Sequence, residues 1–503
     1  MTVTADATKQ QWFGHPRGLA TLFFTEMWER FSYYGMRALL VLFMTTPLAI
    51  SNPGLGFDVV KSSAIYGLYT SLVYLLALPG GWVADKIWGQ KKAVFIGGCI
   101  IAAGHFSLAA PLVGLPDQLS FFLGLFLIVL GTGLLKPNVS TIVGDLYQGD
   151  SGARRDAGFS IFYMGINLGA ILGPFICSTL GESWNWHWGF SAAGFGMVAG
   201  LIQYRRGEKY LGTAGELKTG DSVEVLKKRA RNFYLTLVVV FATLGLFVFL
   251  GVTGAIQVTL TQVATWLGYS IIVLAILYFV ALLLFGGYDK QTNKRLVVIF
   301  WLFILAALFW SGFEQAGSSL NLFARDLTNR VYFGWEMPAG WLQNINPIFI
   351  VVFAPIFGWL WTWLARRKAN PSIPLKFALG LIGLSAGFFV LSWGAANASV
   401  DNPVTPAWLV VTYFLHTVGE LCLSPVGLSS ITKLAPPDRV GQMMGVWFVG
   451  ASLGNLFAGL VAGRLETLAP SALFWNVAIF VGVCGVVAFL FAPVVKKIMG
   501  HVE

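Results

Sequence analysis

The sequence predicts an all-α membrane protein. Of its 503 residues, 56% are hydrophobic and only 11% are charged, whereas charged residues make up about 25% of an ordinary soluble protein. Apolar stretches of about 20 residues, the length that spans a bilayer as a helix, recur along the whole chain. The charged residues fall mostly between these stretches, in the predicted loops at the membrane surface. The net charge of +10 is therefore explained by these loops, and we expect no nucleic-acid partner.

The apolar windows predict fourteen transmembrane helices. In chain order they cover 19–47, 62–84, 92–112, 119–143, 158–180, 188–204, 233–253, 263–286, 297–324, 341–365, 375–395, 406–431, 442–464 and 473–495. If the N-terminus is cytoplasmic, nearly all Lys and Arg between the windows are cytoplasmic as well, and the other side has only Lys61, Arg325, Arg330 and Arg464. Because cytoplasmic loops are rich in Lys and Arg, we expect both termini in the cytoplasm.

Composition divides the chain into three parts. The longest polar stretch, Arg205 to Arg231, is dense in Lys and Arg, and the two windows after it, from Phe233 to Phe285, contain no charged residue. We expect this pair to be a lipid-facing accessory hairpin, which leaves six helices on either side, as in secondary transporters built from repeated halves. The expected parts are an N-terminal six-helix bundle at 14–204, a cytoplasmic linker with the accessory transmembrane hairpin at 205–295, and a C-terminal six-helix bundle at 296–498.

The loop after the second window carries a recognisable pattern. From Gly81 through Asp85-Lys86 and Gly89 to Lys91-Lys92 it is similar to the loop between helices two and three of major facilitator transporters. An ordinary positively charged turn with glycines at its bends would explain it equally well by itself. Together with twelve core helices, it favours the major facilitator fold.

Charged residues inside the windows are few, and each is costly. An ionisable side chain at the centre of a membrane helix costs roughly 2.5 to 3.5 kcal/mol on insertion scales, so such residues tend to face a polar interior and mark function. They are Glu26, Glu29, Arg30, Arg37, Lys136, Glu314 and Glu420. In the first window the charged residues share one helical face with Tyr33 and Tyr34. The alternative for Glu26 and Arg30 is an ion pair one turn apart that only holds the helix together.

Other windows carry polar stripes of their own. They are Trp310, Glu314, Gly317 and Asn321; Tyr413, Thr417, Glu420 and Ser424; Tyr163 and Asn167; Gln343, Asn346 and Pro347; and Trp447 and Asn455. The cations lie in the first half of the chain, whereas the second half contributes only two carboxylates. A cavity between the halves would therefore suit a zwitterion, with its carboxylate near Arg30, Arg37 and Lys136, its ammonium near Glu420, and aromatic walls from Tyr34, Trp310 and Trp447.

Buried carboxylates beside cations are also suited to carrying protons, which makes Glu26 and Glu314 the candidates for proton coupling. A permanently paired, structural Glu314 is the alternative. The sequence contains no His-Glu-x-x-His, no Gly-x-Ser-x-Gly and no cluster of metal-ligand residues, so we expect no enzyme, no metal and no cofactor.

Several motifs resemble one family. Glu26-Met-Trp-Glu29-Arg30-Phe-Ser-Tyr33-Tyr34-Gly35 resembles the ExxERFxYYG motif of the bacterial proton-dependent oligopeptide transporters, the POT/PTR family of the major facilitator superfamily. Phe162 to Gly169 resembles that family's FYxxINxGS motif and departs from it at Ala170. The segments from Gly131 to Asn138 and from Gly419 to Pro425 are similar to the family's helices four and ten.

The resemblance implies a symporter that imports di- and tripeptides by alternating access, driven by the proton gradient. By the family pattern, Glu26, Glu29 and Arg30 couple the proton, and Lys136–Glu420 and Arg37–Glu314 form two gating ion pairs, the second on the outer side. Tyr69 competes with Tyr74 for one place in the peptide site. The expected substrate-binding residues are Tyr33, Tyr34, Arg37, Tyr74, Lys136, Asn167, Trp310, Asn346, Glu420 and Trp447.

A symporter of nitrate or another anion is the rival, since plant relatives carry such cargo. Glu420 argues against it, because an acidic wall gives nothing to an anion. We expect a monomer in the bacterial cytoplasmic (inner) membrane, with peptides, protons and the lipid bilayer as its partners.

Overall fold

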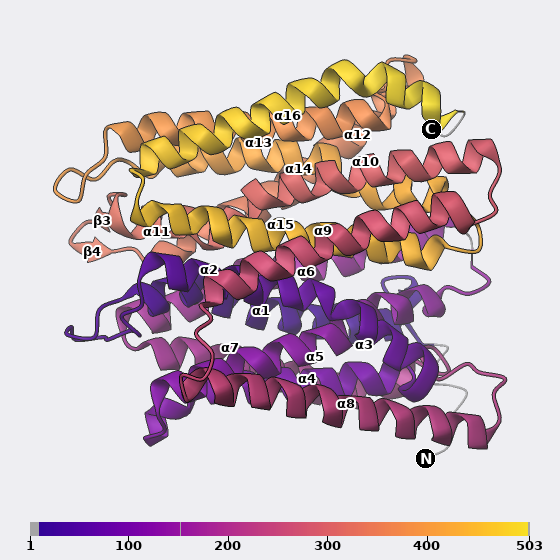
Figure 1. Ribbon diagram of the computed structural model, residues 1–503, viewed down its shortest axis with the longest axis horizontal. Coiled ribbons are helices and arrows are strands. Elements are labelled where there is room, and N and C mark those ends of the chain that lie inside the picture. Colours follow the sequence, from indigo (N-terminus) through magenta and orange to yellow (C-terminus); the bar gives the residue numbers. More distant parts are fainter. Residues whose placement is uncertain (1–9, 151, 501–503) are drawn as a thin grey trace.

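The computed structural model describes residues 10–150 and 152–500. Its long helices lie side by side and run back and forth along one direction (Figure 1). Helix α1 begins and α16 ends at one end of the molecule, which we call the terminal end. The opposite end carries the hairpin of β3 (Val331–Tyr332) and β4 (Trp335–Glu336), and we call it the hairpin end.

The first half of the chain forms one group of helices, the lower one in Figure 1. Helix α1 lies at its centre, packed on α6 and α7, and from Leu39 to Met44 no side chain is more than 2% exposed. Gly169 lets α6 approach α1 closely, because a Cβ there would lie 2.2 Å from the backbone oxygen of Met27. The elements are β1 (Gln11–Trp12), β2 (His15–Pro16), α1 (Gly18–Thr45), α2 (Val59–Leu75), α3 (Ala77–Val83), η1 (Ala84–Trp88), α4 (Gln90–Ala109), η2 (Ala110–Val113), α5 (Asp117–Leu146), α6 (Gly152–Ser183), α7 (Trp186–Gly207) and η3 (Glu208–Tyr210).

The second half forms the other group, the upper one in Figure 1. Its core is made by α13, which packs on both α14 and α16. The elements are α10 (Lys290–Phe313), η4 (Glu314–Gly317), α11 (Ser319–Asp326), η5 (Ala339–Asn344), α12 (Ile345–Arg366), α13 (Ile373–Ala396), α14 (Ala407–Leu434), α15 (Val440–Ala462), η6 (Gly463–Glu466) and α16 (Pro470–Met499).

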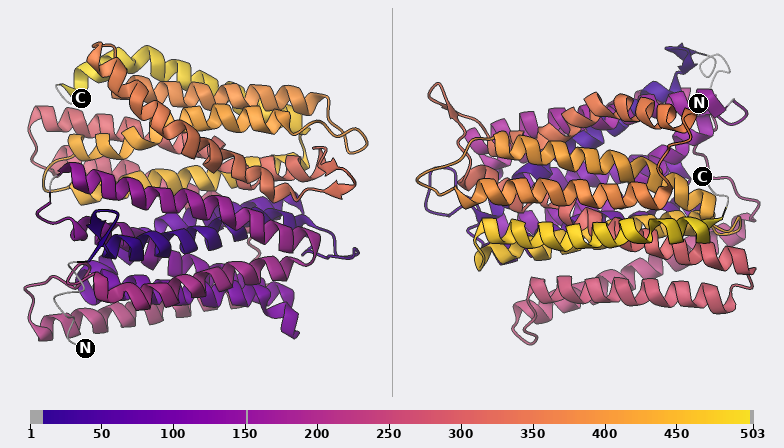
Figure 2. Two further views of the ribbon diagram at one scale, coloured as in Figure 1. Left: turned by 180° about the vertical axis from the view of Figure 1, so that it is seen from behind. Right: turned by 90° about the horizontal axis from the view of Figure 1, so that it is seen from above.

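The two uncharged helices between the halves differ from each other. Helix α8 (Val223–Val252) has no buried residue, as expected of a helix that faces lipid, and the pair lies at the edge of the molecule (Figure 2). Helix α9 (Leu260–Phe285) is less exposed, because Ile271 packs against Phe303 and Leu453 of the second half. One face of α9 therefore packs on the second half of the chain, whereas α8 has no such buried face.

Twelve helical segments of the described chain are long and apolar enough to cross a membrane. Helices α1 and α7 complete the fourteen that the sequence predicts. The charges of α1 set it apart from the twelve, since Glu26, Glu29, Arg30 and Arg37 all lie within it.

Two of the expected helices are interrupted. The helix expected at 62–84 consists of α2, α3 and the π-helical turn η1, and it extends to Trp88. The helix expected at 297–324 is broken at η4, where the backbone oxygen of Glu314 accepts a hydrogen bond from the Tyr66 hydroxyl (3.3 Å). A Cβ on Gly317 would lie 2.2 Å from that hydroxyl, so only glycine fits there. Irregular backbone at membrane depth is tolerated where protein or a cavity satisfies it.

Candidate functional site

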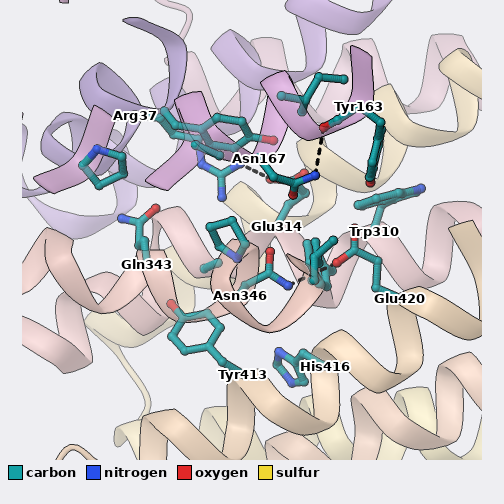
Figure 3. A pocket seen from close by; sticks show the side chains of 18 of the residues that line it. Arg37, Tyr163, Asn167, Trp310, Glu314, Gln343, Asn346, Tyr413, His416 and Glu420 are labelled. Atoms are coloured by element: carbon teal, nitrogen blue, oxygen red, sulfur yellow. Dashed lines mark hydrogen bonds and ion pairs between the residues drawn. The ribbon is translucent and has the colours of Figure 1, made fainter. Parts of the chain in front are cut away.

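A cavity lies between the two halves, with an empty volume of about 810 Å³ that includes space open to solvent. Its wall comes from α1, α2 and α6 on one side and from α10, η4, η5, α12 and α14 on the other. Figure 3 shows its polar and aromatic side chains converging from both halves. The wall includes seven of the ten expected substrate-binding residues, namely Tyr34, Arg37, Tyr74, Asn167, Trp310, Asn346 and Glu420.

One ion pair crosses the cavity towards the hairpin end. Arg37 Nη1 of α1 lies 2.9 Å from Glu314 Oε2 of η4, and both side chains are buried (Figure 3). The guanidinium also lies over the ring of Tyr34, 5.4 Å from its centre. The structure therefore forms one of the two ion pairs that the family resemblance implies.

Glu420 occupies the opposite wall. Its Oε2 accepts a hydrogen bond from Asn346 Nδ2 (3.1 Å), and the same amide donates to Thr417 Oγ1 (2.9 Å). Glu420 is 9% exposed and takes part in no ion pair among the described residues. Its carboxylate is thus positioned by an amide but keeps oxygen lone pairs for a cationic group in the cavity.

The charged stripe of α1 continues from the cavity towards the terminal end. Arg30 Nε lies 2.7 Å from Glu26 Oε1 and 3.2 Å from Glu29 Oε2, and all three side chains are buried. None of the three lines the cavity. The Glu26–Arg30 pair is the ion pair one turn apart that the sequence predicts. Glu29 adds a second carboxylate to the same cation.

Lys136 and Glu420 do not form the ion pair that the resemblance implies. The Lys136 ammonium instead lies over the ring of Tyr74, 3.5 Å from its centre, while Glu420 is held by Asn346. The two residues belong to opposite halves, and the Arg37–Glu314 ion pair, which joins the halves, lies nearer the hairpin end. In this structure the expected pair is therefore open.

The remaining expected residues do not line the cavity. Tyr33 packs against Tyr69, with ring centres 6.4 Å apart, and Trp447 packs against Phe377, with ring centres 6.3 Å apart. Neither of these pairs lines the cavity, nor does Lys136. Of the two tyrosines that competed for one place, Tyr74 lines the cavity and Tyr69 does not.

Other side chains of the wall were not among the expected binding residues. They include Tyr163, Gln343, Tyr413 and His416. Tyr413 lies seven residues before Glu420, and Gln343 three residues before Asn346, so helical spacing already grouped each with a residue of the wall. His416 is buried, with its ring tilted against that of Phe388 at 4.8 Å between centres. It lies three residues after Tyr413 and four before Glu420, so helical spacing puts it on the same face as both.

Comparisons with known proteins match most or nearly all of the chain. The model of the POT family matches residues 91–474. The peptide transporter YePEPT of Yersinia enterocolitica subsp. palearctica serotype O:3 (strain YE-P4) is 40% identical over 503 residues, which cover 98% of this chain and 96% of that protein. A di-/tripeptide transporter of Lactococcus lactis subsp. cremoris is 37% identical over 503 residues, covering 99% of each.

A solved structure agrees with these matches. A crystal structure of a peptide transporter, in complex with sulfate, superposes with a TM-score of 0.89 at 39% identity and covers 98% of this chain and 97% of that one. The expected fold class, an all-α membrane protein of the major facilitator type, is confirmed.

Proposed function

The chain belongs to the POT family, and we propose that it is a symporter that uses the proton gradient to import di- and tripeptides by alternating access. It is a transporter and not an enzyme. The observation that carries the proposal is the pair of opposite walls in one cavity, with Arg37 on the first half and Glu420 on the second. Such a cavity suits a short peptide, which is a zwitterion with a charge at either end.

The peptide ammonium would bind Glu420. That carboxylate is already oriented by Asn346, and Asn346 lies beside it on the cavity wall. The peptide carboxylate would bind the cations of the first half, Arg30, Arg37 and Lys136. The relatives named as peptide and di-/tripeptide transporters support this choice of cargo over a plain anion.

Proton coupling is assigned to the buried carboxylates that share cations. Glu26 and Glu29 share Arg30 at distances of 2.7 and 3.2 Å, so protonation of one would leave the other paired. Glu314 pairs with Arg37 at 2.9 Å without a second carboxylate on that cation among the described residues. A proton on Glu314 would weaken the contact that joins the halves, which is how proton binding would favour reorientation.

Alternating access would move the bundle at 14–204 against the bundle at 296–498, with the segment 205–295 as linker and accessory hairpin. The Arg37–Glu314 pair would close the outer side, and the Lys136–Glu420 pair would form when the inner side closes. Tyr33, Tyr34, Tyr74, Asn167, Trp310 and Trp447 would complete the peptide site.

The protein is a multi-span membrane protein, and we place it in the bacterial inner membrane as a monomer. The terminal end would face the cytoplasm, because most loop Lys and Arg residues lie there. The hairpin end, with Lys61, Arg325, Arg330 and Arg464, would face outwards.

The direct test is uptake of radiolabelled dialanine into liposomes that hold the purified protein, with and without an inward proton gradient. Accumulation that depends on the gradient and stops with a protonophore would support the proposal. Uptake that ignores the gradient would exclude symport. If the liposomes took up nitrate but no peptide, the proposed substrate would be an anion and not a peptide.

A further inference from the structure

One amide on the cavity wall has no partner. The nitrogens of the other two cavity amides are engaged within the protein, Asn167 Nδ2 with the Tyr163 backbone oxygen (3.0 Å) and Asn346 Nδ2 with Thr417 and Glu420. Gln343 Nε2 is buried and has no hydrogen-bond partner among the described residues. Buried polar groups are ordinarily paired, so this nitrogen is suited to a ligand.

Gln343 lies on the hairpin side of the Glu420 and Asn346 pair. It precedes Asn346 by three residues, which is roughly 5 Å along a helical backbone. Tyr413 precedes Glu420 by seven residues, roughly 10 Å towards the same end. Figure 3 shows Gln343 and Tyr413 on the side of Asn346 away from Glu420 and Trp310.

The wall next to this amide includes apolar side chains. Pro347 and Ile350 of α12 line the cavity after Gln343, and both are buried. Arg37 on the facing half pairs with Glu314. His416, which follows Tyr413 by three residues, also lines the cavity, and its buried Nε2 has no hydrogen-bond partner among the described residues. A neutral ligand group near Gln343 could therefore hydrogen-bond to the amide and to the phenol of Tyr413.

We propose that Gln343, with Tyr413, is a specificity-determining subsite that selects peptides with a neutral hydrogen-bonding side chain on their first residue. The proposal rests on the proposed function, because it takes the peptide ammonium to be bound by Glu420. One residue of extended peptide spans about 3.5 Å, so the first side chain can reach an amide one turn away. An apolar side chain of the same size would leave the buried nitrogen unpaired, which is unfavourable.

The test compares peptides of equal shape in competition with labelled dialanine. Asn-Ala against Leu-Ala, and Thr-Ala against Val-Ala, differ mainly in hydrogen bonding. The unaltered protein is expected to prefer the polar member of each pair by about five- to tenfold. In Gln343→Leu that preference is expected to disappear or reverse. Gln343→Glu is expected to favour Lys-Ala over Gln-Ala.

Gln442→Leu is the matched control, because its amide oxygen accepts from Tyr278 and Arg439 outside the cavity. It should keep the preference of the unaltered protein. If a Gln343 variant does not transport, peptide binding to the purified protein gives the same ratios. Equal preferences in Gln343→Leu and the unaltered protein would overturn the subsite, whereas absence of any peptide binding would overturn the proposed function itself.

Discussion

The two ends of the cavity are held in different ways. Towards the hairpin end, hydrogen bonds and an ion pair join the halves directly. They are Arg37–Glu314, Asn321 to the Ala38 oxygen (2.8 Å), Arg325 to Thr45 (2.7 Å), and the Ala339 and Gly340 nitrogens to Glu182 (2.7 and 2.9 Å). Nearer the terminal end, Lys136 and Glu420 each bind a neighbour from their own half. The structure is thus closed at one end, and its charged partners are parted at the other.

This difference between the two ends indicates which contacts must break and which must form during transport. Transport by alternating access requires the contacts of the hairpin end to break when those of the terminal end form. A set of separate polar contacts suits that task, because each is made or lost as a whole. The predictions below test one end against the other.

The largest expected effect concerns the charged cluster of α1. Glu26→Gln removes a carboxylate that pairs with Arg30 at 2.7 Å while keeping its size. We expect gradient-driven accumulation of dialanine to be abolished, whereas counterflow exchange, which needs no net proton movement, continues. Both are measured in the same liposomes. Accumulation at the level of the unaltered protein would exclude Glu26 from coupling.

The Arg37–Glu314 pair is the second test. Glu314→Met leaves the buried Arg37 without its partner, which costs about 3 to 5 kcal/mol, whereas replacing both members by apolar residues is often neutral. We therefore expect a large drop in the thermal stability of purified Glu314→Met, and a recovery in the double variant Arg37→Met/Glu314→Met.

Neither variant is expected to accumulate peptide, because the contact that closes the hairpin end is gone from both. Stability equal to that of the unaltered protein in Glu314→Met would show that the pair contributes little to this closed state.

The third test concerns Glu420, the proposed binding site of the peptide ammonium on the second half of the chain. Glu420→Gln keeps the hydrogen bond with Asn346 possible but removes the charge, and hydrogen bonds to charged groups are worth about 1.5 to 3 kcal/mol. Peptides with a free amino group should lose affinity by about tenfold or more, and their N-acetylated forms should lose little. Competition with labelled dialanine measures both, and an equal loss for the two forms would contradict the ammonium site.

Glu182 carries a smaller effect at the hairpin end. Its carboxylate accepts from two backbone nitrogens at the start of η5, and Glu182→Gln keeps the size but can present only one oxygen acceptor. We expect the hairpin end to open more often, by several-fold, since the change is worth about 1 kcal/mol.

Opening can be followed by labelling the thiol of S178C in a protein whose native cysteines have been replaced. Ser178 is buried beneath Gly340, so a reagent reaches position 178 only when the hairpin end opens. Glu336→Gln is the control, since Glu336 pairs with Arg330 within the same half. Equal labelling rates in Glu182→Gln and in the control would mean that this contact does not hold the end closed.

Much of this molecule could be predicted from its sequence. Membrane helices can be identified from the length and hydrophobicity of their sequences. Charged residues within them are rare, so Arg37, Glu314 and Glu420 are easily recognised as candidates for function. Helical spacing then placed Asn346 and Trp310 on the same cavity wall as those charges.

The rest depends on tertiary packing. Spacing puts Tyr33 on the charged face of α1, but a helix face about 100° wide also meets neighbouring helices, and there Tyr33 stacks on Tyr69. The break at Glu314 follows from Tyr66, 248 residues away in the chain, which no local pattern reveals. Which ion pairs are closed depends on the state of the transporter and is not encoded in either residue of the pair.

The smallest expected effect separates the two partners of Lys136. Its ammonium lies over the Tyr74 ring, a contact worth about 0.5 to 2 kcal/mol that a phenyl ring also provides but an aliphatic side chain does not. Tyr74→Phe should therefore keep the state that is open at the terminal end, whereas Tyr74→Leu should release Lys136 towards Glu420 and favour the opposite state by two- to fivefold. Labelling of S178C reports that shift directly, because the hairpin end opens as the terminal end closes. If Tyr74→Phe and Tyr74→Leu label at the same rate, the ring does not compete with Glu420 for the ammonium, and the asymmetry between the two ends arises from the hairpin-end contacts alone.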